Sequence, residues 1–149
     1  MRLYLDTSVI GGYYDPEFSE WTRPLIDDIL NRKHVSIISD ITIMEIMDAP
    51  RNVNQLLEKL INSNSELITS NEQTDLLASH YLKEGVLTRK SIEDAQHIAL
   101  ATYNNVSAVV SWNFKHLVNM DRIRLFNSVN LKYGYGLIDI RSPREVTGL

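Results

Sequence analysis

The sequence predicts an α/β fold in which helices cover both faces of a parallel sheet. Short apolar runs over 3–5, 35–38 and 106–110 are typical of strands buried in such a sheet. Segments with helical spacing of apolar residues separate these runs, and this alternation indicates a parallel α/β arrangement. The 149 residues contain no internal repeat or linker, so we expect a single domain over residues 1–149.

Breaker residues and apolar spacing place the elements of the first half. Three residues that favour a helix N-cap follow the first strand, and Gly11-Gly12 then break the chain. Beyond this break we expect a helix over 17–33, a strand over 35–38, a helix that begins at 39–40, a second helical piece after Pro50, and a weak strand over 66–69.

The second half continues the same alternation. One helix ends at Gly85, because glycine commonly follows a helix C-terminus. We then expect a long helix over 91–103, a strand over 106–110, two short helical stretches, a last strand over 137–140 and, from Arg141 onward, a surface extension.

Composition excludes several kinds of function. The chain has no cysteine, which excludes disulfides, thiolate zinc sites, iron–sulfur clusters and a thiol nucleophile. A net charge of −4 argues against a basic coat that binds nucleic acid over a whole face. No apolar run is long enough for a membrane span, and an acid at position 6 interrupts any secretory signal. We therefore expect a cytoplasmic protein with no membrane partner.

Four polar residues lie near the predicted strand ends at which parallel sheets bind ligands. Asp6 follows the first strand, and Glu45 lies in the first turns of the helix after the second. Asn113 follows the fourth strand, and Asp94 begins the helix that leads into that strand. That helix runs antiparallel to the strand, so its N-terminal end should lie at the same edge. Three carboxylates and one amide can therefore converge from distant points of the chain.

Converging carboxylates need a compensating charge, because like charges repel and one group would otherwise take up a proton. A divalent cation resolves this conflict. An oxygen-only cluster without cysteine or paired histidines suits a hard ion, Mg²⁺ or Mn²⁺. We therefore expect Asp6, Glu45, Asp94 and Asn113 to be metal ligands and catalytic residues.

Each of these residues also has a structural explanation. The alternatives are a helix cap for Asp6, capping boxes for Thr42-x-x-Glu45 and Ser91-x-x-Asp94, and a turn for Asn113. His97 lies on the same helical face as Asp94, but a lone histidine in a packed helix more often fills structure than binds metal. The functional interpretation rests on the joint occurrence of the four residues.

A second set of residues could contact a phosphate. Ser8 could bond a phosphate or orient Asp6, and Ser111 precedes Asn113 closely. Lys115 belongs to a group of basic residues after Asn113, and Arg89 comes just before the helix of Asp94. We expect these four residues to bind substrate, although a capping role for Ser8 and a solvated helical face for the basic residues remain alternatives.

Four segments of the sequence resemble, in order, the motifs of PIN-domain proteins. They are LDTSVI over 5–10, SDITIMEI over 39–46, DAQHIALA over 94–101 and SWNFKHL over 111–117. The resemblance implies a three-layer α/β/α sandwich with a central parallel sheet of about five strands. It also implies a Mg²⁺- or Mn²⁺-dependent ribonuclease whose acids fall on Asp6, Glu45 and Asp94.

The fourth family position departs from the usual pattern. It is often an aspartate, whereas this chain has Asn113, an amide that can coordinate but carries no charge. Many small members resemble the toxin half of bacterial toxin–antitoxin pairs of the VapC type. Other members stand alone, and the sequence does not separate the two kinds. The resemblance therefore implies an RNA substrate and, for a toxin, an antitoxin protein as a partner; we also expect a homodimer.

Three hypotheses follow. The first is an endoribonuclease in which a carboxylate-bound cation activates water for attack on a phosphodiester. The second is a catalytically weak or inactive PIN-like module that binds RNA or a protein, which the amide of Asn113 favours. The third is a phosphatase of the haloacid-dehalogenase type, which would require a second Asp two residues after Asp6, where the chain has Ser8.

Overall fold

Five parallel strands form the centre of the structure, a computed structural model that describes residues 1–147. Their order across the sheet is β3-β2-β1-β4-β5, and every neighbouring pair is parallel. The strands are β1 (Arg2–Leu5), β2 (Val35–Ser39), β3 (Ser65–Ile68), β4 (Ala108–Val110) and β5 (Ile140–Arg141). The predicted five-stranded parallel sheet is confirmed.

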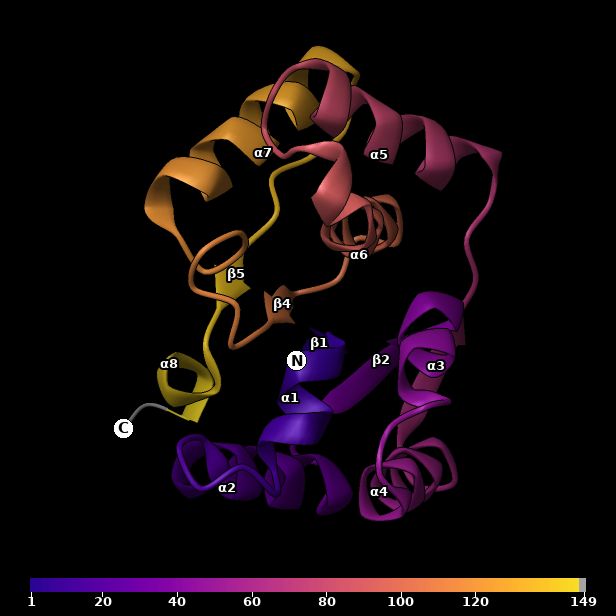
Figure 1. Cartoon of the computed structure of the whole chain (residues 1–149), viewed down its shortest axis with the longest axis vertical. Coiled ribbons are helices and arrows are strands. Elements are labelled where there is room, and N and C mark those ends of the chain that lie inside the picture. Colours follow the sequence, from indigo (N-terminus) through magenta and orange to yellow (C-terminus); the bar gives the residue numbers. More distant parts are fainter. Residues whose placement is uncertain (148–149) are drawn as a thin grey trace.

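Helices cover both faces of this sheet, so the chain forms the predicted three layers. Figure 1 shows α5, α6 and α7 on one side of the sheet and α2 and α4 on the other. The helices are α1 (Thr7–Gly12), α2 (Ser19–Leu30), α3 (Asp40–Ile46), α4 (Arg51–Ile61), α5 (Glu72–Lys83), α6 (Ile92–Tyr103), α7 (Met120–Lys132) and α8 (Pro143–Thr147), with a 3₁₀ turn η1 (Arg89–Ser91). No helix among residues 1–147 is long and apolar enough to cross a membrane.

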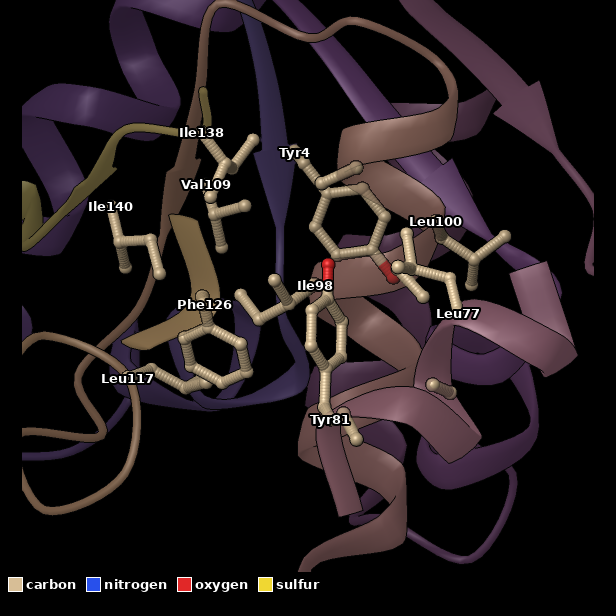
Figure 2. Packing of buried hydrophobic residues seen from close by; sticks show 14 of the residues in the cluster. Tyr4, Leu77, Tyr81, Ile98, Leu100, Val109, Leu117, Phe126, Ile138 and Ile140 are labelled. Carbon is tan, nitrogen blue, oxygen red and sulfur yellow. The ribbon is translucent and has the colours of Figure 1, made fainter. Parts of the chain in front are cut away.

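Alternating side chains of the strands divide the core into two clusters. Leu3 and Leu5 of β1 pack with α1, α2 and α4, whereas Tyr4 between them packs with α5 and α6. The same alternation places Val109 of β4 on the Tyr4 side. Figure 2 shows this second cluster, in which Tyr4 and Tyr81 lie among aliphatic side chains. Because both faces are buried, the strands read as continuous apolar runs in the sequence.

The strand order creates a switch point at the centre of the sheet. From β1 the chain proceeds outward to β2 and β3, and then returns to β4 on the opposite side of β1. The loops that leave β1 and β4 therefore diverge, and a crevice at such a point is where open α/β sheets bind ligands. The backbone N–H of Asp6 donates to the carbonyl of Val110 over 3.2 Å, which joins the ends of these two strands.

Three predictions about the elements need correction. The break expected at Gly11-Gly12 falls at the end of helix α1. Instead of two short helical stretches, the structure has turns followed by the single helix α7, which begins after Asn119 caps two backbone N–H groups. The last strand begins at Ile140, later than expected.

The segment after Arg141 is also more ordered than expected, because it forms the helix α8. This helix packs against α2, where the guanidinium of Arg144 lies 4.8 Å from the centre of the Trp21 ring. The side chain of Val146 packs on the same apolar cluster as α2. The short segment is thus held by tertiary contacts rather than by its own helix propensity.

Candidate active site

Asp6 lies at the switch point, directly after β1 and at the N-terminal end of α1. It occupies the N-cap position, but its side chain makes no capping hydrogen bond. Instead, Oδ1 accepts a hydrogen bond from the hydroxyl of Ser8 over 2.5 Å, and Oδ2 accepts one from the hydroxyl of Ser111 over 2.6 Å. The carboxylate therefore points across the sheet towards the loop after β4, and a capping role does not account for the presence of an acid at position 6.

Burial raises the pKa of Asp6, because the charged form loses its hydration. The charge of His97 and the hydroxyl donors of Ser111 and Ser8 act in the opposite direction, while the charge of Asp94 raises the pKa further. The net shift is upward. An acid in this environment gains from a nearby positive charge, which is the property expected of a cation ligand.

The loop after β4 is fastened to Asp6 through hydroxyl groups. Ser111 is fully buried, and its Oγ accepts a hydrogen bond from the backbone N–H of Asn113 over 2.9 Å. The backbone N–H of Trp112 donates to Ser8 Oγ over 3.0 Å. Ser8 and Ser111 thus orient Asp6 and the loop together. The hydroxyl of Ser111 is buried and engaged with Asp6, and a contact of Ser111 with substrate stays a prediction.

Asp94 and Asn113 are in direct contact. The side-chain amide of Asn113 donates to Asp94 Oδ2 over 3.2 Å, and Nδ1 of His116 lies 3.2 Å from the same oxygen. Asn113 Oδ1 also accepts the backbone N–H of His116 over 3.0 Å, so the turn explanation for Asn113 holds beside its contact with the acid. Ser91 makes no side-chain capping bond at the start of α6, so the capping-box explanation for Asp94 fails.

Glu45 projects from α3 towards α6. The helix is capped by Ser39, whose hydroxyl accepts from the backbone N–H of Thr42, so Thr42 lies inside the helix and the predicted capping box does not form. Glu45 Oε1 instead lies 2.5 Å from Nε2 of His97. The other ring nitrogen of His97 lies 2.6 Å from the hydroxyl of Tyr4.

His97 contacts Glu45 directly, and the charges of Asp6 and Asp94 also act on it. Burial by itself lowers the pKa of His97, but the hydrogen bond that His97 donates to Glu45 and the charges of Asp6, Glu45 and Asp94 together raise it above its usual value. These acids come from the end of β1, from α3 and from α6, respectively. The structure therefore brings Asp6, Glu45 and Asp94 to one region, around a single buried imidazole.

The chemistry of these residues fits a hard cation. Carboxylate and amide oxygens are the donors that Mg²⁺ and Mn²⁺ prefer. The hydroxyl oxygen of Thr7 is buried without a hydrogen-bond partner among residues 1–147, which leaves a further oxygen donor available beside Asp6. Within the same residues, however, no three acidic or histidine side chains are already arranged around one point as metal ligands. Each carboxylate is paired with a protein donor instead.

An open pocket of about 510 Å³ lies beside this cluster. Acidic side chains from two helices contribute to it, so it repels anions and attracts cationic groups. The lining residues are Thr7, Ile41, Met44, Glu45, Asp48, Glu93 and Gln96. The pocket gives solvent access to Glu45, and Thr7 lies in its wall.

The basic residues predicted to contact phosphate are exposed. Lys115 lies in the loop after Asn113, and Arg89 lies in the 3₁₀ turn before α6. Both are close in sequence to site residues, but neither forms a salt bridge among residues 1–147. Two other basic residues that follow Asn113 in the sequence have partners elsewhere: Arg122 donates to the carbonyl of Val86, and Lys132 pairs with Glu84.

Three residues contribute more to the site than their sequence signals indicate. His97 was expected to fill structure, whereas it contacts Glu45, and its spacing from Asp94 was the available signal. Tyr4 carries no signal beyond a polar atom within an apolar run. Thr7 was considered only for capping, and its unpaired hydroxyl can be recognised only in three dimensions.

Comparisons with known proteins support the fold. No protein-family model matches the chain, and no curated protein matches it. Solved structures do match: VapBC2 from Rickettsia felis bound to a DNA fragment from its promoter has a TM-score of 0.59 at 16% identity, over 95% of this chain and 98% of that chain. FitAB bound to the IR36 DNA fragment has a TM-score of 0.57 at 15% identity, over 95% and 94% of the two chains.

FitAcB from Neisseria gonorrhoeae also matches, with a TM-score of 0.57 at 16% identity, over 95% of this chain and 97% of that chain. The likeness covers nearly the whole length of each chain, and the name VapBC2 agrees with the family that the four sequence motifs resemble. The predicted PIN-like fold is therefore confirmed. At this level of identity the likeness shows the fold alone.

Proposed function

We propose that this protein is a metal-dependent endoribonuclease that hydrolyses phosphodiester bonds of RNA. The observation that carries the proposal is the convergence of three acids at the switch point of the sheet. Ser111 and Asn113 connect Asp6 to Asp94 through hydrogen bonds, and Glu45 contacts His97, which follows Asp94 on α6. None of these three acids makes the capping bond that would explain it structurally. Acids that converge at the ligand-binding edge of a sheet, with one of them buried and its pKa raised, are characteristic of functional sites.

Asp6, Glu45 and Asp94 would hold Mg²⁺ or Mn²⁺, with the amide oxygen of Asn113 assisting. Such a cation, when bound, lowers the pKa of a coordinated water and stabilises negative charge on the phosphate. The chain supplies the orientation of the ligands: Ser8 and Ser111 fix Asp6, and Asn113 fixes Asp94. The expected products carry a 3′-hydroxyl and a 5′-phosphate.

RNA would approach the crevice over an acidic surface. Glu45, Asp48 and Glu93 line the adjoining pocket and repel phosphates, so RNA binding as well as cleavage should require the cation. The exposed cations Lys115 and Arg89 are the candidates for contact with the RNA backbone. Charge reversal at either position should weaken RNA binding without removing the cation site.

A cleavage assay tests the proposal. Wild type should cut single-stranded RNA in Mg²⁺ or Mn²⁺ and lose cleavage in excess chelator. Asp6→Asn and Asp94→Asn should reduce cleavage by about 10²-fold or more, as expected for the loss of a catalytic group. Asp27→Asn, at an exposed position of α2, makes the same chemical change away from the site and should cut like wild type. Equal cleavage by all four proteins would reject this site.

A second candidate is a PIN-like module with weak or no catalysis. Two observations favour it: an amide occupies position 113, and every site carboxylate is already paired with a protein donor. Thermal unfolding in millimolar Mn²⁺ separates the two candidates. A binding site stabilises the native protein by mass action and raises Tm. An unchanged Tm together with tight binding of RNA or a protein would favour the module.

We also propose an antitoxin protein as a partner, a homodimer, and a cytoplasmic location. The similar structures carry the printed names of two-component complexes, VapBC2 and FitAB, each bound to DNA. A small open reading frame beside the gene would identify the candidate partner, and co-expression followed by purification would test the complex. Light scattering of the isolated chain would show whether it is a dimer.

A further inference from the structure

Tyr4 is a polar residue in the middle of the central strand. It is fully buried in the apolar cluster of α5 and α6, and Figure 2 shows its hydroxyl among carbon side chains. A hydroxyl at such a position destabilises the fold unless it is hydrogen-bonded. Tyr4 meets this requirement with two partners, Ser39 Oγ at 2.7 Å and Nδ1 of His97 at 2.6 Å. The hydroxyl therefore connects β1 to the start of α3 and to α6.

His97 links the hydroxyl of Tyr4 to the carboxylate of Glu45. The imidazole is rigid and almost completely buried, so a contact at Nδ1 fixes the direction in which Nε2 points. Nε2 points at Glu45 Oε1, and an ionised carboxylate only accepts, so this nitrogen carries the hydrogen. The order of contacts is thus Tyr4, His97 and Glu45, from the core to the edge of the pocket.

Glu45 is the acid that most needs such support. Its side chain has three rotatable bonds and is about one-fifth exposed, at 22%, whereas Asp6 is short, buried and held by two serine hydroxyls. A ligand that is already held in one orientation loses less conformational freedom when it binds. Among the described residues, only His97 forms a hydrogen bond with the carboxylate of Glu45.

We propose that Tyr4 and His97 are positioning residues that hold Glu45 in the orientation required for cation binding. The inference rests on the proposed function, because it concerns the cation that Asp6, Glu45 and Asp94 are proposed to hold. It differs from a purely structural role in one respect. A structural network stabilises the fold alone, whereas a positioning pair also sets the affinity of the site for a divalent cation.

Tyr4→Phe is the informative variant, and Tyr81→Phe is its matched control. Tyr81 is fully buried in the same cluster, and its hydroxyl bonds to Asn130 and Thr102, away from every acid of the site. Both variants should lower Tm by similar amounts in chelator. Only Tyr4→Phe should weaken Mn²⁺ binding, by about tenfold or more, as observed when supporting residues of metal ligands are removed.

Mn²⁺ binding is measured by calorimetric titration of the protein and by the rise in Tm that Mn²⁺ produces. In the cleavage assay, Tyr4→Phe should need about tenfold more Mn²⁺ for half-maximal activity, with a maximal rate close to that of wild type. His97→Gln keeps an amide donor that can reach Glu45 and should retain more affinity than His97→Leu. This pair provides the test if Tyr4→Phe does not fold.

The outcomes separate the inference from the function on which it rests. If wild type binds Mn²⁺ and cuts RNA, but Tyr4→Phe binds Mn²⁺ as tightly as Tyr81→Phe, the positioning role is wrong and the ribonuclease proposal stands. Equal Mn²⁺ affinity of His97→Leu and wild type would overturn the positioning role in the same way. If wild type neither binds Mn²⁺ nor cuts RNA, the proposed function is wrong and the positioning role is overturned with it.

Discussion

The side-chain amide of Asn113 donates a hydrogen bond to Asp94 Oδ2 over 3.2 Å. The contact joins the loop after β4 to the first turn of α6. An amide at this position stabilises the neighbouring carboxylate by donating to it. An aspartate, the residue that PIN-domain proteins often have here, would face Asp94 with a like charge.

Asn113→Asp should therefore lower the stability of the metal-free protein and strengthen cation binding. In chelator, loss of the hydrogen bond and the added repulsion should lower the free energy of unfolding by about 2 kcal/mol. In millimolar Mn²⁺ the added ligand should give a larger rise in Tm than in wild type. Thermal unfolding with and without Mn²⁺ measures both effects.

Asn119→Asp is the control for this change. Asn119 caps α7 by accepting two backbone N–H groups, and an aspartate can accept the same bonds. It adds the same charge and should leave the response to Mn²⁺ unchanged. A Mn²⁺ response in Asn113→Asp no larger than in wild type would contradict the assignment of position 113 to the cation site.

Asp6→Asn should stabilise the protein in chelator at neutral pH. Burial raises the pKa of Asp6, so the native state binds this proton more readily than the unfolded state. Wild-type stability is therefore lost as pH rises through the native pKa and is regained as pH falls towards the unfolded value, about 3.8. Asparagine avoids the buried charge and keeps both serine contacts by reorienting one hydroxyl.

The expected gain near pH 7 is about 1 kcal/mol, or roughly 2–4 °C in Tm for a chain of this size. It should shrink steadily as the pH approaches about 4, where Asp6 is protonated more fully in both states. Thermal unfolding at several pH values, with exposed Asp27→Asn as the comparison, measures it. A Tm below that of wild type at pH 7 would show that the ionised carboxylate stabilises the site.

Gly12→Ala should disturb the packing of Trp112, next to the candidate site. A Cβ at Gly12 would lie 2.9 Å from Trp112 Nε1 and 3.1 Å from Thr22 Oγ1, two atoms that form a hydrogen bond with each other. Trp112 belongs to the loop that holds Asn113. We expect a loss of about 1–3 kcal/mol in the free energy of unfolding, which is typical of overpacking.

Gly11→Ala provides a matched comparison in the same helix. A Cβ at Gly11 would meet no atom within 4 Å, and alanine favours helix over glycine by about 1 kcal/mol. Gly11→Ala should therefore stabilise the protein while Gly12→Ala destabilises it, as measured by denaturant unfolding. Equal effects of the two substitutions would contradict the close packing of α1 against Trp112.

Local sequence signals were sufficient for the sheet and for most of the helices. The apolar runs around Tyr4, Ile37 and Val109 predict buried strands, because both faces of the parallel sheet are covered. Helix α8 could not be predicted in this way. Its five residues form a helix through contacts with Trp21 and neighbouring side chains of α2, and such contacts leave no periodic pattern in the sequence.

The residues of the candidate site could be proposed from the sequence, but their contacts with one another could not. Strand-end positions and the PIN-like motifs identify Asp6 and Asp94. Spacing also suggested a capping box at Glu45, and the structure shows that Ser39 caps this helix instead. The contact of Glu45 with His97 joins residues 52 positions apart, and a sequence without an alignment contains no signal for a pairing at that distance.

A crystal of the protein soaked in Mn²⁺ tests the central claim most directly. We predict an anomalous peak at the switch point between β1 and β4, within coordinating distance of the carboxylates of Asp6, Asp94 and Glu45. A fully occupied Mn²⁺ elsewhere, with these three carboxylates still paired only to serine, histidine and asparagine, would contradict it.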